Sequence, residues 1–139
     1  MNISPGDALP VLEVTPTTRQ LVQYAAATDD WYEAHYDLEY ARSIGLPGVI
    51  THGLFKFALL ARAVTNWAGP DCFVRELSAQ YRAMDLVNQP FGAGGSVLAV
   101  DRDGDLTVVR LRLEGTSADG TVSTTGFATV DLPTTARSA

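Results

Sequence analysis

The feature that most constrains the fold of this chain is a strongly apolar segment, "HGLFKFALLARAVTNWAG", at residues 52–69. Its apolar residues recur at three- and four-residue spacing, which predicts an α-helix of about four turns ending at Gly69-Pro70. The spaced positions are Leu54, Phe57, Ala58, Ala61, Val64 and Ala68, and Leu59, Leu60 and Trp67 widen the apolar face. Such a helix is expected to be buried, with Lys56 and Arg62 reaching solvent along one edge.

From residue 71 onward the hydrophobic period changes from that of a helix to that of a strand. "VVRLRLEG" at 108–115 alternates apolar and polar residues, and Asp-Gly turns at 101–105 and 117–121 are typical of hairpins. The pattern predicts an antiparallel meander of four strands, at 72–84, 93–101, 105–115 and 121–131. A long apolar helix followed by such strands predicts an α+β fold, with a roughly five-stranded antiparallel sheet wrapped around the central helix.

The first half of the chain adds short elements. Residues 11–15 are a candidate strand, and Pro16 favours a helix start at "TTRQLVQYAAA". Asp37 and Gly45 are suitable caps for a short helix, "DLEYARSIG". Since there is no internal repeat and no linker, residues 1–139 are expected to form one domain. A sheet this small leaves unpaired edges, so pairing with a second subunit is expected.

Composition excludes several classes of function. The net charge is −6 and the ten Lys and Arg residues are scattered singly, so the basic patch of a nucleic-acid-binding protein is missing. The single cysteine, Cys72, excludes an internal disulfide and is expected to be a small buried residue, not a nucleophile. The N-terminus lacks a signal-peptide pattern, and the apolar stretch 52–68 is too short and too charged to span a bilayer. A cytoplasmic protein without a membrane partner is therefore expected.

One stretch, "TDDWYEAHYD" at 28–37, puts four carboxylates around one of only two histidines. A carboxylate and a histidine can perform general acid–base catalysis, because histidine titrates near neutrality. Asp30 and His35 would point about 140° apart on a helix and to opposite faces of a strand. They can cooperate only if the segment between them is an irregular turn. Asp37 is more simply a helix cap, and Asp29, Glu33 and Glu39 are expected to face water.

The second histidine lies in "PGVITHGL", where His52-Gly53 occupies the expected first turn of the apolar helix. The free backbone N–H groups of a first turn, with the positive end of the helix dipole, can bind an anion or an oxyanion. Gly53 has no Cβ, so a ligand carbonyl can approach its amide closely. The Gly53 amide is therefore the better functional candidate, and the His52 side chain is more simply a helix-start residue.

In combination, these residues resemble the MaoC-like hydratases and dehydratases, which include the (R)-specific enoyl-CoA hydratases. The signature of that family is roughly Gly-Asp-x-Asn-Pro-x-His-x-Asp, then an Ala and a Gly, then His-Gly-Met at the start of the central helix. The residues in register with it are Asp30, His35, Asp37, Ala41 and Gly45, followed at the family's distance by His52-Gly53-Leu54. The similarity covers most of the chain and is strongest over residues 19–70.

The resemblance implies a hot-dog fold and the reversible addition of water to a trans-2-enoyl thioester, which gives a (3R)-3-hydroxyacyl thioester. The acyl group would be carried on CoA or acyl carrier protein, and no cofactor and no metal are implied. By the same resemblance, Asp30 and His35 activate the water and protonate the neighbouring carbon, and Gly53 N–H polarises the thioester carbonyl. Tyr32, His52 and Leu54 are expected to bind substrate, in a homodimer or in a heterodimer with another hot-dog subunit.

The chain departs from the family signature beside the catalytic pair. Asp29 stands in place of Gly, Tyr32 in place of Asn and Glu33 in place of Pro. Loss of the proline removes a fixed φ from the turn, and the bulky Tyr32 can narrow or reshape the acyl site. The departures therefore bear on the substrate, whereas Asp30 and His35 are intact.

Three other functions remain open. The chain can be an acyl-binding or partner subunit without catalysis of its own, or a thioesterase on the same fold. The third is a metal site made of His35, His52 and a carboxylate, although these histidines lack the spacing typical of metal ligands.

Overall fold

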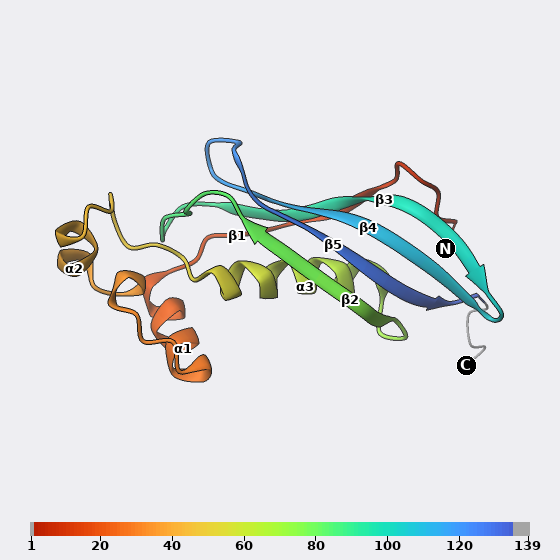
Figure 1. The fold of residues 1–139 in the computed structure, drawn as a ribbon, viewed down its shortest axis with the longest axis horizontal. Coiled ribbons are helices and arrows are strands. Elements are labelled where there is room, and N and C mark those ends of the chain that lie inside the picture. Colours follow the sequence, from red (N-terminus) through yellow and green to blue (C-terminus); the bar gives the residue numbers. More distant parts are fainter. Residues whose placement is uncertain (1, 135–139) are drawn as a thin grey trace.

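A computed structural model describes residues 2–134, so the limits of the predicted 1–139 domain, at Met1 and 135–139, lie outside the described residues. The elements in chain order are β1 (Ala8–Val14), α1 (Thr18–Thr28), η1 (Glu33–His35), α2 (Leu38–Ser43), α3 (Gly53–Ala68), β2 (Phe73–Tyr81), β3 (Phe91–Asp103), β4 (Leu106–Thr116) and β5 (Val122–Pro133). The α+β prediction is confirmed, because an antiparallel five-stranded sheet curves over the long helix α3 (Figure 1).

The two short helices begin at the side-chain caps that their sequences provide. Thr17 Oγ1 accepts from Gln20 N–H at 3.2 Å, and Gln20 Oε1 accepts from Thr17 N–H at 2.9 Å, which together form a capping box at the start of α1. Asp37 accepts from Tyr40 N–H at 2.9 Å and so caps α2, as predicted. Gly45 follows the end of α2 with a φ of +87°, a conformation that suits glycine.

The strand order is β1-β3-β4-β5-β2, which corrects one part of the predicted topology. Strands β3, β4 and β5 form a meander, but β2 pairs with β5 and does not lie beside β3. The connection at 82–90 does not form a tight turn that would pair β2 with β3, because its backbone bonds to other segments. Its Arg82 N–H donates to Ser123 O at 2.7 Å, and its Val87 N–H donates to Val49 O at 3.0 Å.

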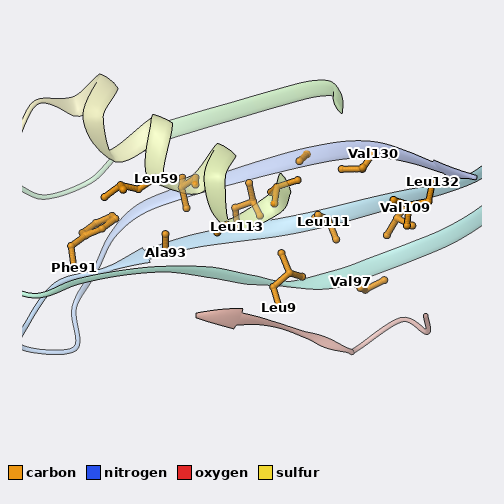
Figure 2. Packing of buried hydrophobic residues seen from close by; sticks show 14 residues of the cluster. Leu9, Leu59, Phe91, Ala93, Val97, Val109, Leu111, Leu113, Val130 and Leu132 are labelled. Carbon is orange, nitrogen blue, oxygen red and sulfur yellow. The ribbon is translucent and has the colours of Figure 1, made fainter. Parts of the chain in front are cut away.

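The core lies between α3 and the inner face of the sheet. Figure 2 shows Leu59 of α3 and Leu111 and Leu113 of β4 directed into this layer. Leu111 and Leu113 are fully buried, as their alternation with arginines predicts. Cys72 is partly buried and packs against the same cluster, in agreement with the packing role expected for it.

Lys56 contradicts the prediction that it reaches solvent along the edge of the helix. It is 2% exposed, and its Nζ lies 2.7 Å from Asp85 Oδ2. The side of α3 that carries Lys56 packs against the 82–90 connection, and helical periodicity cannot reveal that this connection supplies a carboxylate. Arg62, by contrast, is exposed as expected.

Two further features of the described residues are the length of the helices and the edges of the sheet. Within residues 2–134, no helix is long and apolar enough to cross a membrane. In the described sheet, β1 and β2 are the edge strands, and each pairs along one side only.

Candidate active site

The segment that contains Asp30 and His35 lies beyond one end of the sheet, beside the start of α3 (Figure 1). Helix α1 ends because Asp29 takes a left-handed conformation with φ 57°, and Asp30 N–H then donates to Ala25 O at 3.2 Å. After two residues without regular structure, η1 makes a single turn that ends at His35. The irregular turn that Asp30 and His35 require is therefore present.

His35 is held in one tautomer by a backbone carbonyl. Its side chain is buried, and Nδ1 lies 2.8 Å from Ile50 O. Because a carbonyl oxygen can only accept, Nδ1 of the neutral ring carries the proton, and Nε2 is left with a free lone pair. This is the form of histidine that can take a proton from water.

His52 stacks on His35, with ring centroids 3.8 Å apart and planes inclined by 22°. It is fully buried, its Nε2–H donates to Asp30 O at 3.3 Å, and its Nδ1 has no hydrogen-bond partner among the described residues. Burial, followed by the adjacent His35, lowers the pKa of His52, so the ring is neutral at pH 7. The side chain makes no capping bond to α3, so its role differs from that of an ordinary helix-start residue.

Asp30 completes a cluster with the two histidines. One ligand-type atom of each of Asp30, His35 and His52 lies within 4.8 Å of the other two, and Asp30 is only partly buried. These three residues are thus a possible set of metal ligands, even though their spacing in the sequence is not typical of one. The same closeness lets a carboxylate and an imidazole contact one water molecule.

Gly53 opens α3, directly after the cluster. The first bond within the helix runs from Lys56 N–H to His52 O at 3.2 Å, which leaves the amides of the first turn without partners inside the helix. A Cβ built on Gly53 would lie 3.0 Å from Cε2 of Tyr81. The absence of a side chain therefore makes room for the Tyr81 ring, which no feature of the sequence indicated.

Tyr32 and Leu54, the other residues expected at the substrate, are both exposed. The ring of Tyr32 meets His35 edge to face at 5.6 Å and Tyr40 at 5.9 Å, and 45% of the residue is exposed. Leu54 is 54% exposed. Both side chains are available to contact a ligand, and Tyr32 also packs against the imidazole that would act on it.

Tyr24 of α1 is a site residue that sequence reasoning missed. Its ring meets those of His52 and Phe55 edge to face, each at 5.2 Å. Burial, and after it the negative charge of Asp30, raises the pKa of Tyr24. Tyr24 shares one side of its helix with other apolar residues, and nothing in that pattern indicates a contact with His52. Ile50 contributes a backbone carbonyl, which no residue type reveals.

The cluster therefore offers three chemical functions close together. A carboxylate and a neutral imidazole can hold a water and transfer its proton. The N–H groups at the start of α3 can stabilise negative charge that develops on an oxygen. Aromatic rings pack on both histidines, Tyr32 on His35 and Tyr24 on His52.

Comparison with known proteins adds to this geometry. The model of a family described as "MaoC like domain" matches residues 4–115. Over 103 residues the chain is 29% identical to the 3-oxo-4,17-pregnadiene-20-carboxyl-CoA hydratase beta subunit of Mycobacterium tuberculosis. The aligned region covers 74% of this chain and 79% of that subunit.

Solved structures show the same fold. The ChsH1-ChsH2 complex of Mycobacterium tuberculosis matches with a TM-score of 0.82 and 23% identity, over 93% of this chain and 98% of the other. The (R)-hydratase of A. caviae involved in PHA biosynthesis matches with a TM-score of 0.87 and 20% identity, over 94% and 98%. The sheet curved around one long helix is thus the hot-dog fold.

Proposed function

The chain belongs to the MaoC-like domain family, and from that premise we propose that it is a hydratase or dehydratase of acyl thioesters. The reaction would interconvert trans-2-enoyl and (3R)-3-hydroxyacyl thioesters. Asp30, His35 and the amide of Gly53 would carry the chemistry.

One observation above all supports this proposal. Ligand-type atoms of Asp30 and His35 lie within 4.8 Å of each other, and the bond from His35 Nδ1 to Ile50 O leaves Nε2 free to accept a proton. An acid–base pair of this kind can share one water molecule. The same cluster lies against the first turn of α3, where an oxyanion can be bound.

In the hydration direction, the water gives a proton to the Asp30–His35 pair as its oxygen attacks C3 of the enoyl group. A proton is then delivered from the pair to C2, so that OH adds to C3 and H to C2. Negative charge on the thioester oxygen is stabilised by Gly53 N–H, and one donor of this type contributes about 3–4 kcal/mol in other enzymes. No step requires a metal or a redox cofactor.

A CoA thioester is the favoured substrate, and a second hot-dog subunit is the favoured partner. The name of the Mycobacterium tuberculosis relative describes a CoA hydratase and its beta subunit, and one matching structure is a complex of two named components. The contact of Tyr32 with His35 and its partial exposure support a role for Tyr32 in selecting the acyl group. A subunit that binds the acyl chain for a catalytic partner is the second candidate, supported by the same relatives.

The test is an assay of enoyl absorbance with crotonyl-CoA and with longer and cyclic enoyl-CoAs. The chain is assayed alone and together with candidate partner subunits. Asp30→Asn and His35→Ala should each abolish most of the activity while the protein stays folded. Hydration that survives both substitutions would overturn the proposed mechanism.

The same samples separate a hydratase from a thioesterase. A thioesterase releases free CoA, which a thiol reagent detects, whereas hydration leaves the thioester intact. Activity that appears only with a partner and is insensitive to Asp30→Asn would favour the partner-subunit function.

A further inference from the structure

A buried ion pair links α3 to the connection between β2 and β3. Lys56 Nζ lies 2.7 Å from Asp85 Oδ2, with side-chain exposures of 3% and 6%. Nζ also donates to Ala83 O at 3.0 Å, and Ser123 Oγ donates to Asp85 Oδ2 at 2.7 Å. Ser117 Oγ donates to the other carboxylate oxygen of Asp85. The carboxylate is therefore fixed from α3, from β5 and from the turn before β5.

Stability alone does not account for such a pair. Removing two charges from water is costly, and replacing a buried ion pair by apolar residues of similar volume is often neutral or stabilising. A pair that is retained under these conditions can instead fix one arrangement of the chain. The question is which arrangement this pair fixes.

The main chain of Asp85 holds the segment that leads into the site. Asp85 O accepts from Thr51 N–H at 2.8 Å, and Ile50 forms an isolated antiparallel bridge with Leu86. Ile50 O is the acceptor for His35 Nδ1, and Thr51 directly precedes His52. Ile50 N–H also donates to Ala34 O at 3.1 Å, so Asp85 is one of two anchors of this segment, and it is the one that connects the segment to α3.

Lys56 closes this set of contacts into a ring. It lies one turn after Gly53 on the same helix, and its Nζ donates a hydrogen bond to the Asp85 carboxylate. The ring runs from the start of α3 through Lys56 to Asp85, from Asp85 to Thr51, and back to α3. If the ion pair is lost, Asp85 and with it the carbonyl of Ile50 can shift relative to the helix.

We propose that Lys56 and Asp85 are positioning residues for the acid–base site, which hold Ile50 O against His35 Nδ1 and the segment 50–52 against the start of α3. The consequence for catalysis rests on the proposed hydratase function. The hydrogen-bond partners of the Lys56 and Asp85 side chains are Ala83 O, each other, Ser117 and Ser123, so the effect on His35 is transmitted through the backbone of residues 50–52.

The test is the double variant Lys56→Met/Asp85→Leu, which removes both charges and leaves neither unpaired. The control is Arg75→Met/Asp131→Leu, in a more exposed pair whose side-chain exposures are 39% and 10%. It removes another ion pair, in which Arg75 Nε lies 2.6 Å from the Asp131 carboxylate, at the opposite end of β2 from Tyr81. We expect both variants to fold, as measured by circular dichroism. Only the first should lower kcat for enoyl thioester hydration, by about 10²-fold, with little change in KM, because a misplaced catalytic group costs roughly that much.

A second readout needs no substrate. The chain has two histidines, so ¹⁵N spectra of histidine-labelled protein resolve each tautomer. Wild type should show His35 protonated at Nδ1, and Lys56→Met/Asp85→Leu should show a mixture of tautomers, unlike the control. Ser123→Ala, which removes one donor to Asp85 and keeps the charges, should give a smaller shift in the same direction.

These readouts make the inference and the proposed function separable. A folded double variant with the wild-type His35 tautomer would overturn the positioning role, as would equal losses of kcat in the double variant and the control. If the wild-type chain hydrates no enoyl thioester, the proposed function fails, and the tautomer comparison still decides whether the ion pair positions His35.

Discussion

The imidazole rings of His35 and His52 stack 3.8 Å apart, and each donates to the main chain beside the other. His35 Nδ1–H donates to Ile50 O, on the segment that leads to His52. His52 Nε2–H donates to Asp30 O, on the segment that leads to His35. This reciprocal bonding holds the two rings stacked, and each ring uses one nitrogen in it.

Acid should destabilise the protein through His52. Its pKa is lowered in the folded state by burial and by His35, whereas in the unfolded state it titrates near its ordinary value of 6.5. Above that value both states are neutral. As the pH falls below it, the unfolded state binds a proton that the folded state does not, so the free energy of unfolding decreases until the folded pKa is passed.

Urea unfolding of wild type and of His52→Gln, between about pH 7.5 and pH 5, checks this. The decrease in unfolding free energy should be steeper in wild type. Glutamine keeps a donor for Asp30 O but does not titrate. Parallel curves would contradict the stacked, neutral state of His52.

Gly53→Ala should be tolerated poorly while Tyr81 is present. The new Cβ would lie 3.0 Å from Tyr81 Cε2, so the ring must move. In a Tyr81→Ala background this conflict is absent, and alanine has the better helix propensity. A double-mutant cycle measured by thermal or urea unfolding should give a coupling of about 0.5–3 kcal/mol. Additive effects would show that the ring does not rest on Gly53.

Tyr32 should control which acyl group is accepted. The ring is partly exposed and packs on His35, so its removal enlarges the space beside the His35 imidazole. Tyr32→Ala should raise kcat/KM for cyclic enoyl-CoAs relative to crotonyl-CoA, whatever its effect on the absolute rate. Tyr32→Phe keeps the ring and should keep the preference. Equal preference in all three proteins would remove Tyr32 from the acyl site.

Chelation should leave the hydratase rate unchanged, because the proposed chemistry needs only protons and backbone donors. Zn²⁺ should inhibit, because it can bind where ligand-type atoms of Asp30, His35 and His52 lie within 4.8 Å of one another. Rates are measured before and after dialysis against EDTA, and with added zinc. Activity that is lost with EDTA and restored by a metal would establish the metal-site alternative instead.

Much of the secondary structure could be predicted because it depends on local sequence patterns. The alternation at 108–115 and the Asp-Gly turns on either side predicted β4 within a residue at each end. The spacing of apolar residues predicted α3, and Asp37 caps α2 because a carboxylate at that position satisfies a free amide. These features depend on neighbours a few residues apart.

The sequence by itself thus determined the buried helix, the strands, and Asp30 and His35 as the candidate pair. Tertiary structure alone decided that β2 joins β5, that Lys56 is buried against Asp85, and that His35 binds Ile50 O. Periodicity reports which face of an element is apolar, but not which distant carboxylate or carbonyl will meet it. A backbone carbonyl is the same in every residue, so no residue type can indicate that Ile50 O will bind His35. Such partners meet only when the 82–90 connection and the segment before α3 pack together.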